Sequence, residues 1–89
     1  MWALELAPDG ITVNAVAPGP VETELFRENN PVGSEGEARY LAMVPMNRIG
    51  SVDDIAAAIS FLLSDDAGWL TGQTLRVDGG SSIGRSANG

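Results

Sequence analysis

The chain has 89 residues, a net charge of −7, and neither cysteine nor histidine, so it has no disulfide, no thiolate–metal site and no histidine base. Its only cations are five scattered arginines, which predicts neither nucleic acid nor an anionic membrane surface as a partner. No apolar stretch is long enough to span a membrane and the first residues lack the basic region of a signal peptide, so we expect a cytoplasmic protein.

The N-terminal part of the sequence predicts the last turns of a helix and then a strand. Residues 1–7 favour a helix, which we expect Pro8 to end because its ring and its missing N–H do not suit a helix interior. Residues 11–17 are rich in β-branched side chains and predict a strand. The turn Pro18-Gly19-Pro20 ends that strand sharply.

The middle of the chain predicts three helices. Two short ones cover residues 22–28 and 37–44, with a polar loop at residues 29–36 between them. The third begins at Ser51, whose hydroxyl can cap it, and acidic residues follow near the positive end of the helix dipole. The spacing of its apolar side chains predicts one core-facing stripe, made of Val52, Ile55, Ala56, Ile59, Leu62 and Leu63.

The opposite side of this third helix carries small and aromatic side chains instead of charges. Ala57, Ala58 and Phe61 project there, and this composition suits packing against a second body. Two interpretations stay open, namely contact with a partner and burial under the rest of the same domain.

The last predicted element is a second strand at residues 73–77, which Asp78-Gly79-Gly80 ends. Two strands with helices between them predict a parallel βαβ unit. A two-stranded sheet is rarely stable by itself, and one edge of the first strand would lie open. We therefore expect residues 1–80 to be part of a larger α/β sheet, with a flexible tail at residues 81–89.

Three segments resemble, in order and spacing, segments of the short-chain dehydrogenase/reductase family, in particular members similar to 3-oxoacyl-carrier-protein reductase. They are LELAPDGITVNAVAPGPVET at residues 4–23, MNRIG at 46–50 and TGQTLRVDGG at 71–80. The resemblance implies a Rossmann-type, doubly wound parallel sheet, of which this chain supplies the C-terminal βαβ portion with the last two strands. It also implies hydride transfer between NAD or NADP and a small-molecule carbonyl or alcohol substrate.

The resemblance gives the loop after the first strand a role in cofactor binding. Ligands of such sheets bind outside the carboxyl ends of the strands, and in the family the matching loop borders the nicotinamide ring. This implies cofactor contacts with the backbone of Val21 at the carboxamide and the Thr23 hydroxyl nearby, in a set made of Pro18, Gly19, Val21 and Thr23. The residues alone favour a simpler interpretation, in which the prolines and glycine only form a turn and Thr23 only caps the next helix.

The resemblance also assigns a substrate lid and an oligomer interface. Residues 22–49 match the lid of the family, and its apolar lining is expected among Leu25, Phe26, Tyr40, Leu41 and Met43. A homo-oligomer interface is expected at Ala57, Ala58, Phe61 and the strand from Gln73 to Val77.

The catalytic residues of the family have no match in this sequence. The family pairs a Tyr and a Lys four residues apart on one helix, whereas Tyr40 is followed at that distance by Val44 and the chain has no lysine. The nearest glycine pair, in Gly33-Ser34-Glu35-Gly36, follows no strand and is interpreted as a surface loop. We expect no catalytic residue in this chain, and no metal site because its acidic pairs lie at helix ends.

Two functions remain as hypotheses. The first is the C-terminal segment of an NAD(P)-dependent short-chain oxidoreductase, which contributes the nicotinamide-side loop, the substrate lid and the oligomer interface and is inactive by itself. The alternative is a stand-alone, non-enzymatic interaction module that pairs its open strand edge with another chain.

Overall fold

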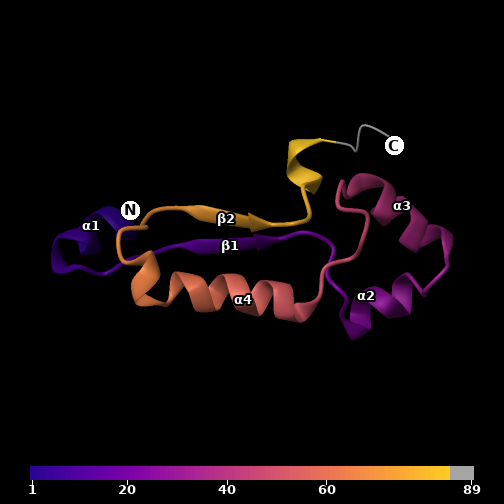
Figure 1. The fold of residues 1–89 in the computed structure, drawn as a ribbon, viewed down its shortest axis with the longest axis horizontal. Coiled ribbons are helices and arrows are strands. Elements are labelled where there is room, and N and C mark those ends of the chain that lie inside the picture. The colour runs from indigo at the N-terminus through magenta and orange to yellow at the C-terminus, as the bar shows by residue number, and fades with distance from the viewer. Residues whose placement is uncertain (85–89) are drawn as a thin grey trace.

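The structure is a computed structural model and describes residues 1–84 as a mixed α/β arrangement around two parallel strands (Figure 1). The strands are β1 (Ala15–Pro18) and β2 (Thr74–Val77), and the helices are α1 (Trp2–Leu6), α2 (Glu24–Asn29), α3 (Glu35–Met43) and α4 (Val52–Leu62). Three short 3₁₀ turns complete the described part, namely η1 (Ala7–Asp9), η2 (Asp65–Ala67) and η3 (Ser81–Ile83).

The two strands pair in parallel, as the sequence predicts, with Ala15 opposite Thr74 and Pro18 opposite Val77. The observed β1 is shorter than the predicted strand at residues 11–17. The reason lies in Asn14, whose side chain takes the place of the backbone ladder there and bonds to the segment that leads into β2.

Asn14 connects the start of β1 to the start of β2 through both ends of its amide. The Asn14 Nδ2 donates to the carbonyl oxygen of Leu70 at 3.0 Å, and the Oδ1 accepts from the backbone N–H of Gln73 at 3.0 Å. One residue earlier, the N–H of Val13 donates to the Thr71 Oγ1 at 3.0 Å. These bonds set the register of the strands before regular pairing begins.

The helix ends follow their capping residues. The chain does not leave the helical conformation at Pro8, as predicted, but continues through η1, because the missing proline N–H is tolerated in the first turn of a helix. The loop predicted at residues 29–36 is also too long. Ser34 accepts from the N–H of Glu37 at 3.2 Å and so starts α3 at Glu35, which makes Gly36 a buried helix residue instead of part of a surface loop.

Helix α4 packs along both strands, but its buried face is rotated from the predicted stripe. Val52 and Leu63 are 57% and 83% exposed, and Ala56 is exposed as well. Ala58, predicted on the opposite side, is half-buried with Ile55. A helix over only two strands has no neighbours for the side chains at its flanks, so the predicted stripe is wrong there.

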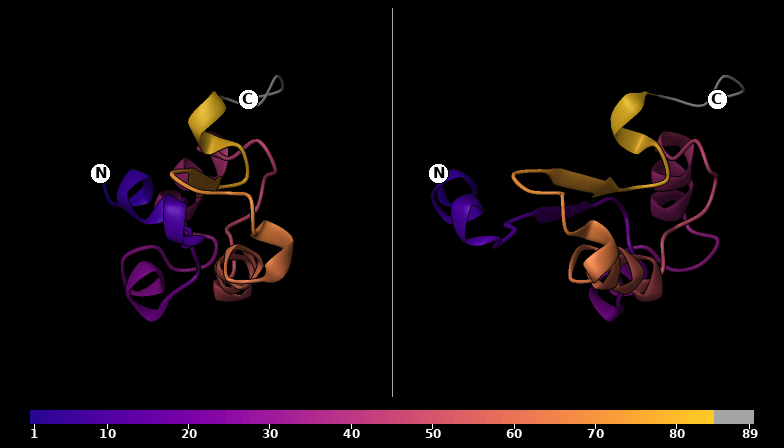
Figure 2. Two further views of the ribbon diagram at one scale, coloured as in Figure 1. Left: turned by 90° about the vertical axis from the view of Figure 1, so that its left-hand side faces the viewer. Right: turned by 60° about the vertical axis from the view of Figure 1, so that its left-hand side comes forward.

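The sheet has open margins. Within residues 1–84, β1 pairs only with β2, which confirms the predicted open edge. The only buried apolar residues in this part of the chain are Ala3, Val44 and Ala67. The radius of gyration is 15.9 Å, against about 12 Å for a compact domain of this length. Figure 2 shows the resulting elongated shape, with α1 projecting beyond the amino ends of the strands.

Two further expectations concern the membrane and the tail. Among the described residues, no helix has the length and apolarity needed to cross a membrane. The cytoplasmic location stays a prediction.

The tail predicted at residues 81–89 begins with η3, and its residues 85–89 lie outside the described part of the chain.

Candidate functional site

The candidate site lies at the carboxyl ends of β1 and β2, where the loop after β1 meets the turn after β2 (Figure 1). Gly19 follows β1 directly, and its N–H donates to the carbonyl oxygen of Val77 at 3.1 Å. A Cβ at Gly19 would lie 2.7 Å from the Cβ and 2.9 Å from the Cα of Asp78. Glycine is therefore needed here for close packing of the loop on the end of β2.

Val21 presents its backbone polar groups away from the rest of the loop. It forms a parallel bridge with Gly50, in which the Gly50 N–H donates to the Pro20 carbonyl at 2.9 Å and the Glu22 N–H donates to the Gly50 carbonyl at 2.8 Å. In such a bridge the N–H and C=O of Val21 point to the opposite side. Neither group has a backbone partner among residues 1–84, so both remain available for a hydrogen bond.

Thr23 lies two residues beyond Val21 and caps α2. Its Oγ1 accepts from the N–H of Phe26 at 3.1 Å, so the predicted helix cap is present. The cap uses only an acceptor lone pair, and the hydroxyl hydrogen stays free to donate. Capping and a cofactor contact are therefore compatible at this residue.

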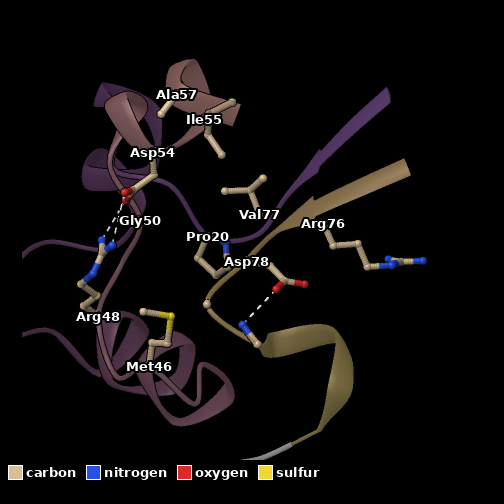
Figure 3. A pocket seen from close by; sticks show the side chains of 12 residues that line it. Pro20, Met46, Arg48, Gly50, Asp54, Ile55, Ala57, Arg76, Val77 and Asp78 are labelled. Atoms are coloured by element: carbon tan, nitrogen blue, oxygen red, sulfur yellow. Dashed lines mark hydrogen bonds and ion pairs between the residues drawn. The ribbon is translucent and has the colours of Figure 1, made fainter. Parts of the chain in front are cut away.

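An ion pair holds Gly50 in position from the other side (Figure 3). The Arg48 Nη1 and Nη2 donate to the two carboxylate oxygens of Asp54 at 2.8 and 3.3 Å. The same carboxylate accepts from the N–H of Ser51 at 2.8 Å, and Ser51 accepts in return from the N–H of Asp54. The pKa of Asp54 is held far below its usual range, mainly by the hydrogen bonds from Arg48 and to a smaller extent by those with Ser51.

The turn after β2 fixes the far end of the predicted lid. Gly79 and Gly80 have φ angles of 63° and 94°, the left-handed region that favours glycine. A Cβ on Gly79 would lie 2.7 Å from the Val44 Cγ1, and the Gly79 carbonyl accepts from the N–H of Met46 at 3.0 Å. The Asp78 carboxylate accepts from the N–H groups of Gly80 and Ser82. These hydrogen bonds lower the pKa of Asp78, with the larger contribution from Ser82.

A pocket of about 400 Å³ opens between this turn and the N-terminal end of α4 (Figure 3). Met46, Pro20 and Val77 form its apolar wall. The side chain of Arg76 extends away from the Arg48–Asp54 pair in Figure 3, so the two guanidinium groups do not converge. The pocket lies where the segment from Met46 to Gly50 and the start of α4 meet the end of β2.

The residues of the predicted lid form a helical hairpin of α2 and α3. The rings of Phe26 and Tyr40 meet edge to face with centroids 5.2 Å apart. Arg27 stacks over Phe26 at 5.4 Å and joins Glu22 and Glu37 through hydrogen-bonded ion pairs. The pKa of Glu37 is lowered mainly by the hydrogen bond from the N–H of Gly33 and, to a smaller extent, by the hydrogen bond from Arg27.

A groove of about 700 Å³ runs along this hairpin. Four of the five predicted lining residues contribute to it, namely Leu25, Phe26, Tyr40 and Met43. Leu41, the fifth, is not part of the lining. Thr23, the predicted cofactor residue, does line the groove, so the predicted cofactor loop and the predicted lid adjoin each other.

The described residues hold no complete catalytic or metal constellation. Tyr40 contacts Phe26, and the chain has no lysine to accompany it. In residues 1–84, no three His, Cys, Asp or Glu side chains come together as metal ligands do. What this arrangement offers chemically is a backbone N–H and C=O at Val21 without backbone partners among residues 1–84, and a groove lined by Thr23 and the α2–α3 hairpin.

Comparison with known proteins agrees with this geometry. A family model described as enoyl-(acyl carrier protein) reductase matches residues 1–82. The chain belongs to the short-chain dehydrogenase/reductase family. It is 47% identical over 78 residues to the 3-oxoacyl-[acyl-carrier-protein] reductase of Salmonella typhimurium, a match that covers 88% of this chain and 31% of the relative. The chain thus spans about a third of the length of the curated relatives it matches.

Solved structures of the short-chain dehydrogenase/reductase family superimpose closely on the chain. A short-chain type dehydrogenase/reductase from Mycobacterium ulcerans gives a TM-score of 0.85 at 37% identity, over 94% of this chain and 30% of that one. A putative 2-deoxy-D-gluconate 3-dehydrogenase from Agrobacterium tumefaciens, solved with bound NADP, gives 0.84 at 39% identity, over 92% and 33%. The fold is therefore part of a Rossmann-type α/β fold.

The sequence did not indicate the contacts that distant segments make with the loop after β1. Gly50 and its bridge to Val21 join positions almost thirty residues apart, and nothing local marks that contact. The reciprocal cap of Ser51 and Asp54 did leave a signal, because a serine followed three residues later by an acidic residue is typical of a capping box.

Proposed function

We propose that this chain is the C-terminal part of an NAD(P)-dependent oxidoreductase that moves a hydride between the nicotinamide ring and a carbonyl or alcohol carbon. In the whole protein it would contribute the loop beside the nicotinamide, the substrate lid and an oligomer interface. The cofactor would supply the hydride chemistry. The residues of this chain would orient the ring and cover the substrate.

The free backbone groups of Val21 carry this proposal. A carboxamide offers an NH₂ group that donates and a carbonyl oxygen that accepts, and Val21 presents the complementary C=O and N–H on one side of a clamped loop. The Thr23 hydroxyl, which can still donate, lies two residues further on. Because Gly19 and Gly50 anchor the loop, this arrangement exists before a ligand arrives, which favours binding.

The test uses a chimera in which residues 1–84 replace the matching C-terminal part of the Salmonella reductase. We expect NADH or NADPH oxidation with a small 3-oxo substrate, whereas the 89-residue chain alone should give none. Absence of turnover in a folded chimera would contradict the proposal.

Substitutions at Thr23 sharpen this test. Thr23→Val removes the hydroxyl and should raise the KM for the cofactor about ten-fold, since a hydrogen bond of about 1.4 kcal/mol is lost. Thr23→Ser keeps both the cap and the donor and serves as the matched control. If both variants bind the cofactor like the parent, Thr23 only caps α2.

A second candidate function is pairing of the open strand edge with another chain. In the register of β1 and β2, the N–H and C=O of Val16 point away from β2. Light scattering of the 89-residue chain separates the two functions. A defined oligomer with a cooperative thermal transition favours the interaction module.

A further inference from the structure

The groove of the α2–α3 hairpin contains one charged side chain. Its lining is otherwise uncharged, and the charged member is Arg39, in a chain whose net charge is −7. Arg39 lies four residues before Met43 on α3, so the two share a helix face, and Tyr40, three residues before Met43, also lines the groove. A single cation therefore adjoins the apolar part of the groove.

Arg39 differs from Arg27 and Arg48 in having no side-chain partner among residues 1–84. Arg27 is engaged by Glu22 and Glu37, and Arg48 is engaged by Asp54. Within residues 1–84, Arg39 makes neither a side-chain hydrogen bond nor an ion pair. Its donors are thus free to bind oxygen atoms of a ligand.

We propose that the groove binds an amphipathic substrate with a negatively charged group, a carboxylate or a phosphate, at a distance from its reacting carbonyl. Phe26, Tyr40 and Met43 contact the apolar chain, and Arg39 binds the anionic group. This inference rests on the proposed function, which places the reacting carbon near the nicotinamide side of the groove at Thr23. The two ends of the lid hairpin thereby define which end of the substrate reacts.

Binding to the folded chimera tests the inference without turnover. Octanoate and octanamide have the same shape and differ in charge, and their dissociation constants are measured by titration calorimetry and by the NMR shifts of α2 and α3. We expect octanoate to bind about five-fold more tightly, the upper range for an exposed charge pair. Octyl phosphate, as a third probe, distinguishes a preference for carboxylate from one for phosphate.

Three variants locate the effect. Arg39→Gln should remove the preference for octanoate and leave octanamide binding unchanged, whereas Arg39→Lys should retain the preference because it keeps the charge. Arg76→Gln makes the same chemical change on β2, outside the groove, and should change neither constant.

The remaining outcomes overturn the inference. Equal binding of octanoate and octanamide, loss of the preference in Arg76→Gln, or no binding of either probe would each show that Arg39 is only a solvated surface charge. Failure of the proposed function is recognised separately, because it appears as a folded chimera without turnover. An anion preference in a folded chimera without turnover would support the groove assignment and contradict the proposed function.

Discussion

Two regions of the molecule differ in whether their residues find packing and hydrogen-bond partners within this chain. The loop junction, made of residues 19–22, Gly50 and residues 78–80, is held by backbone hydrogen bonds and by glycines in close contact. The apolar flanks, made of Trp2, Leu63 and Trp69, are 74%, 83% and 101% exposed. The first region is complete within this chain, and the second is not.

The difference shows which interactions each region depends on. Directional bonds and steric fit specify the junction, and all of their partners lie within residues 1–84. The flanks carry large apolar side chains, whose burial stabilises a fold only when other atoms cover them. The junction should therefore respond to substitutions within this chain, whereas the flanks should respond only in a larger assembly.

The largest expected effect breaks the junction at Gly19. Gly19→Ala places a Cβ 2.7 Å from the Cβ of Asp78 and 2.9 Å from its Cα, and backbone atoms cannot move aside as a flexible side chain can. We expect the chimera to lose about 3 kcal/mol of unfolding free energy. Urea denaturation monitored by circular dichroism measures this loss.

Gly33→Ala is the matched control for that substitution. Gly33 has a φ of 82°, and no atom lies within 4 Å of the position that an added Cβ would take, so the variant tests backbone conformation without crowding. It should cost about 1 kcal/mol. An equal or smaller loss in Gly19→Ala would show that the junction is not close-packed.

The next effect concerns Phe61, an apolar side chain outside the junction that is 43% exposed and belongs to the predicted oligomer interface. Phe61→Ser should weaken association of the chimera about thirty-fold, because a buried aromatic anchor contributes about 2 kcal/mol or more to an interface. Sedimentation velocity over a range of concentrations measures the change.

Val32→Ser is the control, since Val32 is 79% exposed and lies outside both the apolar flanks and the predicted interface. It should leave association unchanged. If Phe61→Ser instead lowers the unfolding free energy while the oligomer persists, Phe61 is buried under the remainder of its own domain, which is the other interpretation of that helix face.

The elements that sequence predicts well are those whose signals are local. The strand ended by Pro18, the cap at Ser51 and the parallel pairing all depend on residue type and short spacing, and the structure has each of them. Element ends were wrong where a side chain competed with the backbone. Asn14 shortened β1, and Ser34 extended α3 toward the N-terminus.

The sequence indicated a candidate loop, but not the contacts that hold that loop in place. The loop from Pro18 to Thr23 follows from the resemblance, whereas the bridge from Val21 to Gly50 depends on chain folding over long separations. The buried face of α4 was also predicted wrongly, because periodicity alone does not show how many strands the helix covers. Ala58 and Val52 exchanged their expected environments for that reason.

The smallest expected effect is a pH dependence located at Asp54. Its pKa in the folded state lies well below the ordinary value of 3.8, chiefly because Arg48 donates to it. A lowered pKa stabilises the fold at pH values above the unfolded pKa, and that stabilisation is lost as pH falls from about 4 toward the folded pKa. The chimera should therefore lose stability on acidification, and Asp54→Asn should lose less.

Urea midpoints at pH 7 and pH 3 measure this difference. Asp54→Asn should be less stable than the parent at pH 7 and closer to it at pH 3, because the parent carboxylate has by then begun to lose its contribution. Asp53→Asn is the control, since Asp53 makes no side-chain hydrogen bond among residues 1–84. Asp78 and Glu37 also have lowered pKa values, so part of the acid sensitivity should persist in Asp54→Asn. A parallel pH profile in Asp54→Asn and the parent would show that the Arg48–Asp54 pair does not hold the junction in place.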